Sequence, residues 1–127
     1  MSLLEIDKKN LPRHVAVIMD GNGRWAKKKG QRREYGHRAG RKAVKRIVES
    51  CVELKIKNLT LYAFSTENWN RPKLEIDFLM QLLLLSLKDE LKNLNKNNIK
   101  FETIGNLERL PKKISNYLLK VKEETKD

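Results

Sequence analysis

The apolar residues of this chain follow two kinds of spacing, and each predicts a type of element. Three short runs are rich in β-branched and aromatic residues: 14–19, 58–64 and 100–104. Such runs predict buried strands. Apolar positions recur at helical spacing over residues 38–56 and 73–97, and a last amphipathic helix is opened by Pro111. The alternation of strands and helices predicts an α/β fold, with a parallel sheet of about three strands and flanking helices.

The helix predicted over residues 73–97 is apolar on nearly every side in its first half. Its apolar residues there are Phe78, Leu79, Met80, Leu82, Leu83, Leu84, Leu85 and Leu87. A helix of this kind is buried, or it borders an apolar cavity or another subunit. Plain core packing and the lining of an apolar tunnel are therefore both open interpretations of these leucines.

A polar turn follows the first predicted strand. Residues 20–25 read Asp-Gly-Asn-Gly-Arg-Trp and precede a Lys-rich helix predicted at 26–29. At such a junction backbone N–H groups converge on one point, glycines allow a ligand to come close, and Arg24 adds a guanidinium. Asp20 supplies the hard oxygen that a magnesium ion bridging to a diphosphate needs. The same residues also suit a simple tight turn.

Basic residues downstream favour the anion site over the simple turn. The cluster comprises Arg24, Lys27, Lys28, Lys29, Arg32, Arg33, His37, Arg38 and Arg41. A turn needs none of these charges, whereas a polyanionic ligand does. Part of the cluster lies in a basic loop that we expect at residues 30–37. The formal net charge of +12 indicates an anionic partner, which is a phosphorylated metabolite, a nucleic acid or an anionic membrane surface.

Length and cysteine content limit how the chain can be organised. We expect the 127 residues to form one α/β domain, incomplete because three parallel strands are few, with residues 1–12 as an N-terminal arm. The single Cys51 excludes an internal disulfide and, on an apolar helix face, predicts a small buried hydrophobe. No run approaches the length of a membrane span, so we infer a cytoplasmic protein, with peripheral membrane contact left open.

Two long motifs resemble the signatures of a known family. Residues 14–26 read HVAVIMDGNGRWA, Gly36 and His37 follow, and residues 61–72 read LYAFSTENWNRP. In this order and spacing they are similar to the motifs of the cis-prenyltransferases, which are typified by undecaprenyl diphosphate synthase. The similarity runs from about Leu11 to the end of the chain. Both motifs span the carboxyl end of a predicted strand, where open α/β sheets bind ligands.

The resemblance implies condensation of isopentenyl diphosphate with an allylic diphosphate of the farnesyl diphosphate type, with magnesium as cofactor and each new double bond cis. The product would be a long-chain polyprenyl diphosphate such as the undecaprenyl carrier lipid for cell-wall synthesis. Asp20 is implied as catalytic carboxylate and metal ligand, and Asn68 as the second catalytic residue, assigned as proton acceptor. Because an amide is a weak base, we interpret Asn68 as orienting a proton-accepting phosphate or water. The implied substrate-binding residues are Gly21, Asn22, Gly23, Arg24, Trp25, Arg33, His37, Ser65, Thr66, Glu67, Trp69 and Arg71.

Complete members of the family run to about twice this length, so the chain resembles their amino-terminal half. The other half carries the arginines and serine that bind isopentenyl diphosphate, a further metal carboxylate and much of the homodimer interface. We therefore expect residues 1–127 alone to elongate a prenyl chain poorly. Peripheral membrane contact during product release is left open.

The competing hypothesis is a basic RNA- or DNA-binding module in which Trp25 and Trp69 stack on bases. Such a groove needs neither a carboxylate at the centre of its anion site nor an apolar helix segment, so we expect no nucleic-acid partner. A nucleotide-binding fold is disfavoured, because the chain lacks both G-x-x-x-x-G-K and G-x-G-x-x-G.

Overall fold

The computed structural model describes residues 6–63 and 69–126, which fall into two compact units. The first unit is Met1–Asn68 and the second is Trp69–Asp127. Each unit is described by itself.

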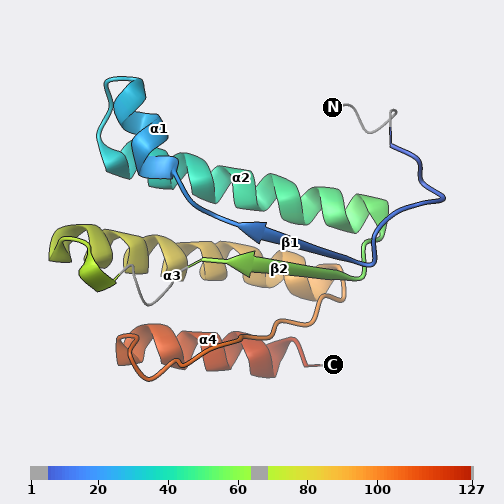
Figure 1. The fold of residues 1–127 in the computed structure, drawn as a ribbon. Helices are drawn as coiled ribbons and strands as arrows, with labels where there is room; N and C mark the ends of the chain where they lie inside the picture. Colours follow the sequence, from blue (N-terminus) through green and yellow to red (C-terminus); the bar gives the residue numbers. More distant parts are fainter. Residues whose placement is uncertain (1–5, 64–68, 127) are drawn as a thin grey trace. The chain divides into compact units, whose positions relative to one another are not determined.

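The first unit is built on two parallel strands, β1 at His14–Ile18 and β2 at Asn58–Tyr62. Their register pairs His14 with Asn58 and Ile18 with Tyr62. The short helix α1 at Asn22–Lys28 and the long helix α2 at Arg33–Leu54 connect them, and α2 runs back along the strands between their ends (Figure 1). The first two predicted strands and their parallel pairing are confirmed, and both strands end at the same edge of the sheet. Their predicted burial is wrong, because every residue of the two strands is half-buried or exposed.

Helix α2 begins earlier than the sequence indicates. We expected a basic loop at residues 30–37, but the helix starts at Arg33 and the connection after α1 is short. Gly30 makes that connection with a φ of 72°, a left-handed conformation that glycine adopts without steric cost. The prediction was wrong because Gly36, although a weak helix former, lies inside α2, where it packs against α1.

The second unit is a pair of helices, α3 at Lys73–Lys96 and α4 at Lys112–Glu124. Each begins directly after a proline, Pro72 or Pro111, with a φ of −53° that suits a helix start. The two helices run in the same direction, and residues 97–111 return between their ends (Figure 1). Their buried side chains include Met80, Leu84, Leu87, Leu94, Ile114, Leu118 and Val121. One stripe of the leucine-rich segment is thus core, whereas Leu85 is exposed.

The third predicted strand is wrong, so the described sheet has two strands where we expected about three. Residues 100–104 form no strand. A strand needs a neighbouring backbone, and here the Phe101 N–H donates to Thr125 Oγ1 at 2.9 Å. The Thr125 hydroxyl in turn donates to the Val121 carbonyl oxygen at 2.8 Å, so the end of α4 satisfies this one backbone N–H of the segment.

Candidate functional site: the Asp20 turn and the hollows beneath α2

The turn after β1 holds the Asp20 carboxylate at the protein surface. Gly21 has a φ of 86°, and its N–H donates to Asp20 Oδ1 at 2.8 Å. Arg24 Nη2 lies 3.3 Å from Asp20 Oδ2, with the two side chains 70% and 62% exposed. An exposed pair of this kind contributes little to stability. Both groups are therefore available to a ligand at small energetic cost.

Helix α1 starts inside the predicted turn, at Asn22, where we expected a helix only from residue 26. The Trp25 N–H already donates to the Gly21 carbonyl oxygen at 2.9 Å. The glycines of this motif consequently do different things. Gly21 supplies the left-handed conformation that turns the chain out of β1, whereas Gly23 lies buried within the helix.

Arg33, at the start of α2, lies against Gly23. A Cβ atom added to Gly23 would lie 2.8 Å from Arg33 Cζ and 2.9 Å from its Nε and Nη2 atoms. The absence of a side chain at Gly23 therefore gives this guanidinium its place. The structure thus brings Arg33 to the same helix start as Asp20 and Arg24. His37 is half-buried one helical turn beyond Arg33, on the same face of α2.

Two glycines of α2 set how closely the helices approach, and sequence reasoning identified neither as functional. A Cβ on Gly36 would overlap the Asn22 carbonyl oxygen, and a Cβ on Gly40 would overlap Asn22 Nδ2. Asn22 is therefore held against α2 by both its backbone and its amide. The signal was present in the sequence as two glycines four residues apart, but Gly36 was predicted to lie in the basic loop, so their position on one face of α2 was missed.

The Trp25 ring, which the resemblance assigns to the substrate site, takes part in a surface cluster. It stacks on Tyr35 with 5.8 Å between ring centroids and 9° between planes. The Lys29 ammonium lies 4.6 Å from the Trp25 ring centroid. This ring therefore helps to dock α1 on α2, which accounts for an aromatic residue that is 40% exposed.

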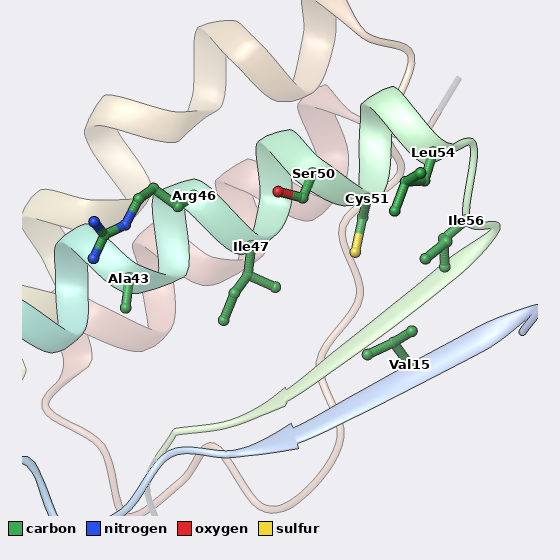
Figure 2. Close-up of a pocket in the computed structure, with 8 residues that line it drawn as sticks. All are labelled: Val15, Ala43, Arg46, Ile47, Ser50, Cys51, Leu54 and Ile56. Carbon is green, nitrogen blue, oxygen red and sulfur yellow. The ribbon is translucent and has the colours of Figure 1, made fainter. Parts of the chain in front are cut away.

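Two hollows lie beneath α2 and share Ala43 and Ile47 in their linings. The smaller, about 180 Å³, is lined by Val17, Ile18, Met19, Asp20, Asn22, Gly40, Ala43, Val44 and Ile47. The larger, about 380 Å³, reaches Leu54 and Ile56 at the far end of the helix. Figure 2 shows the side chains of Ala43, Ile47 and Cys51 directed from α2 toward the strands, with Val15 of β1 opposite.

The lining of the larger hollow is mostly apolar, with Arg46 and Ser50 as its polar members. Cys51 is half-buried there, and burial raises the pKa of its thiol above the usual value, because the thiolate is poorly solvated. The side chain therefore stays a neutral thiol at physiological pH, although it is half-buried where we predicted a buried residue. Asp20 thus lines the smaller hollow, and mostly apolar side chains line the larger one.

The second motif is described only from Trp69 onward. Four of its predicted site residues lie outside the described residues: Ser65, Thr66, Glu67 and Asn68. In the second unit, the Arg109 guanidinium lies 5.1 Å from the Trp69 ring centroid. Arg71 Nη1 lies 2.7 Å from Glu75 Oε1. Each predicted site residue of this unit is thus held by a charged neighbour that sequence reasoning missed.

Groups of three or more histidine, cysteine, aspartate or glutamate side chains that would hold a metal ion do not occur in residues 6–63 and 69–126. Across that part of the chain, the structure also contains no helix with the length and hydropathy to cross a membrane. Asp20 is the carboxylate next to the predicted diphosphate site. Magnesium in such sites is bound through one or two carboxylates together with substrate phosphates and water, so a lone Asp20 fits this manner of binding.

A family model described as "Putative undecaprenyl diphosphate synthase" matches residues 18–127. The chain belongs to the undecaprenyl diphosphate synthase family. The match contains every predicted site residue, from Asp20 to Arg71.

Relatives of known name agree with this membership of the undecaprenyl diphosphate synthase family. An isoprenyl transferase from Fusobacterium nucleatum is 49% identical over 120 residues, which cover 94% of this chain and 52% of that protein. A ditrans,polycis-undecaprenyl-diphosphate synthase, farnesyl-diphosphate specific, from Buchnera aphidicola is 52% identical over 120 residues, which cover 94% of this chain and 48% of that protein. The chain thus spans about half the length of the curated relatives it matches.

Solved structures of the same family share the fold. Lavandulyl diphosphate synthase from Lavandula x intermedia, in complex with dimethylallyl diphosphate, matches with a TM-score of 0.84 and 36% identity over 91% of this chain and 50% of that one. A probable undecaprenyl diphosphate synthase from Campylobacter jejuni matches with a TM-score of 0.71 and 41% identity over 92% of this chain and 49% of that one.

Proposed function

We propose that this chain carries the allylic-diphosphate site of a cis-prenyltransferase. The reaction condenses isopentenyl diphosphate with an allylic diphosphate of the farnesyl type and yields a long-chain polyprenyl diphosphate, the undecaprenyl carrier lipid in the form we favour. One observation supports this most: Asp20, which contacts Arg24, lines a hollow under α2 that shares Ala43 and Ile47 with a larger, mostly apolar one. A substrate with an anionic head and a long apolar tail matches both parts.

The head of the site suits departure of diphosphate. When an allylic carbon loses its diphosphate, negative charge grows on the leaving group, so positive groups that are already in place lower the barrier at the transition state. Two guanidinium groups lie at the start of α1. Arg24 contacts Asp20, and Arg33 packs against Gly23. Guanidinium groups bind phosphate oxygens through paired N–H donors.

Asp20 would hold magnesium together with oxygens of the bound diphosphate. When bound, magnesium supplies charge neutralisation at the leaving group. Asp20 Oδ1 accepts from the Gly21 N–H and Asp20 Oδ2 accepts from Arg24, and these contacts orient the carboxylate beside the hollow that it lines. The assignments of Asn68 to proton transfer and of Ser65, Thr66 and Glu67 to substrate binding stay predictions, as do the homodimer and contact with a membrane surface.

The hollows beneath α2 determine which ligands should bind most tightly. Burial of apolar carbon contributes about 0.8 kcal/mol per methylene, a factor of about four in affinity for each, so an isoprenoid tail in the hollows should raise affinity well over tenfold above that of the diphosphate alone. Calorimetry on the folded chain with magnesium tests this with three ligands: a non-cleavable farnesyl diphosphate analogue, farnesol and inorganic diphosphate. The farnesyl diphosphate analogue should bind most tightly.

Two outcomes of that titration contradict the proposal. Equal affinity for farnesol and the farnesyl diphosphate analogue would mean that the turn with Asp20 contributes nothing. Tight binding of random single-stranded nucleic acid that survives moderate salt would favour the nucleic-acid module, because contacts with phosphates alone weaken steeply as salt is added.

A further inference from the structure

The second unit contains a partly buried ion pair at the start of α3. Arg71 Nη1 donates to Glu75 Oε1 at 2.7 Å, and the Glu75 side chain is only 9% exposed while that of Arg71 is 27% exposed. A carboxylate that is withdrawn from water to this degree needs a partner. Within the described residues, Glu75 is the partner that the structure gives Arg71.

The local backbone explains why these two side chains meet. Pro72 is the N-cap of α3, and the residue before a proline is held away from the helical conformation. Arg71 therefore lies outside the helix and reaches Glu75, which stands in its first turn. A carboxylate in this position is also stabilised by the positive end of the helix dipole. Glu75 is thus a firm anchor, and Arg71 is a side chain attached to a stiff piece of backbone.

We propose that Glu75 is a positioning residue that holds the Arg71 guanidinium in place for a substrate diphosphate. Glu75 itself contacts no substrate. An arginine held at one nitrogen has lost part of its rotamer freedom in advance, so it gives up less entropy when its remaining N–H donors bind an anion. This inference rests on the proposed function, in which Arg71 belongs to the substrate-binding residues.

A contribution to folding stability does not by itself explain why an ion pair occurs at this position. Apolar residues of similar volume commonly replace a buried ion pair with no loss of stability, and sometimes with a gain. The pair also immediately follows the predicted substrate-binding loop, two residues after Trp69, which is itself held by Arg109. Retention of a charged pair at this position therefore fits a requirement for an oriented guanidinium.

A double-mutant cycle on the full chain tests the proposal, with inorganic diphosphate and magnesium as the probe and calorimetry as the readout. Arg71→Met should weaken diphosphate binding roughly tenfold or more, because charge-assisted hydrogen bonds are lost. Glu75→Gln should weaken the same binding several-fold, although it removes no group that contacts the ligand. In the Arg71→Met background, Glu75→Gln should have no further effect. Glu123→Gln, which removes the exposed Lys126–Glu123 pair, is the matched control and should leave binding unchanged.

The outcomes separate this inference from the function on which it rests. Absence of diphosphate binding by the wild-type chain overturns the proposed function and this inference with it. Normal binding by wild type with unchanged affinity in Glu75→Gln overturns the inference alone. An equal loss in the presence and absence of Arg71 also overturns it, because Glu75 would then act through the fold. Should Glu75→Gln fail to fold, Glu75→Asp, which keeps the charge but withdraws the carboxylate from Arg71, should show the same loss.

Discussion

The backbone carbonyl oxygen of Asn22 occupies the space that a side chain on Gly36 would need. Because the contact is between backbone and backbone, neither partner can rotate away. It fixes the start of α1, and with it the Asp20 turn, at one point along α2. The diphosphate-binding geometry proposed above therefore depends on a residue that touches no ligand.

Gly36→Ala should destabilise the chain by at least about 1–3 kcal/mol, the usual cost of overpacking a well-packed contact. At a helix interior position without such a contact, the same change stabilises by about 0.5–1 kcal/mol. A loss of stability in Gly36→Ala therefore indicates the contact with the Asn22 backbone. Urea denaturation gives the free energy of unfolding. Gly40→Ala is the matched control, because it meets the Asn22 side-chain amide, which can move, and it should cost less. A neutral or stabilising Gly36→Ala would contradict the packing described.

Arg33→Ala should weaken binding of the farnesyl diphosphate analogue by about tenfold or more, since it removes a guanidinium that donates charge-assisted hydrogen bonds. Arg32→Ala removes the neighbouring, exposed arginine and should change affinity little. Calorimetry at one salt concentration compares the two. Equal losses in both variants would mean that the basic cluster attracts anions only through its overall charge.

Ala43→Phe should distinguish binding of the isoprenoid tail from binding of the diphosphate. Ala43 lines both hollows, so an aromatic ring there fills the space proposed for the tail and leaves the Asp20 turn intact. Affinity for the farnesyl diphosphate analogue should fall toward that for inorganic diphosphate, which should itself be unchanged. Lys42→Phe places the same ring on an exposed position as a control. A loss of inorganic diphosphate binding in Ala43→Phe would contradict the assignment of the diphosphate to the Asp20 turn and of the tail to the hollows.

Cys51 lines the larger hollow, so the rate of its alkylation should show whether a ligand fills that space. Because burial raises the pKa of its thiol, the reactive thiolate is scarce at neutral pH, and alkylation by iodoacetamide should be slow and should accelerate as pH rises. The farnesyl diphosphate analogue should slow the reaction further by covering the thiol, whereas inorganic diphosphate should not. Mass spectrometry of the modified chain measures both rates. Equal protection by the two ligands would place the tail elsewhere.

The local elements were predictable because local physics decides them. Apolar runs after Arg13 and Lys57 predicted β1 and β2, and the prolines at 72 and 111 marked the starts of α3 and α4. In the site, the two motifs named the family and its candidate residues, and the family membership is confirmed. The residue roles are tested by none of these observations and stay predictions.

The tertiary structure decided whatever depends on a partner distant in the chain. Residues 100–104 have strand-like composition, yet they form no strand because Thr125 satisfies the Phe101 N–H where a strand neighbour would be needed. The sequence by itself determined which residue types are present at the turn and under α2. Only the fold decided that Gly23 makes room for Arg33, and that Asp20 and Cys51 line two hollows that share Ala43 and Ile47, because steric fit between segments is a property of their three-dimensional packing.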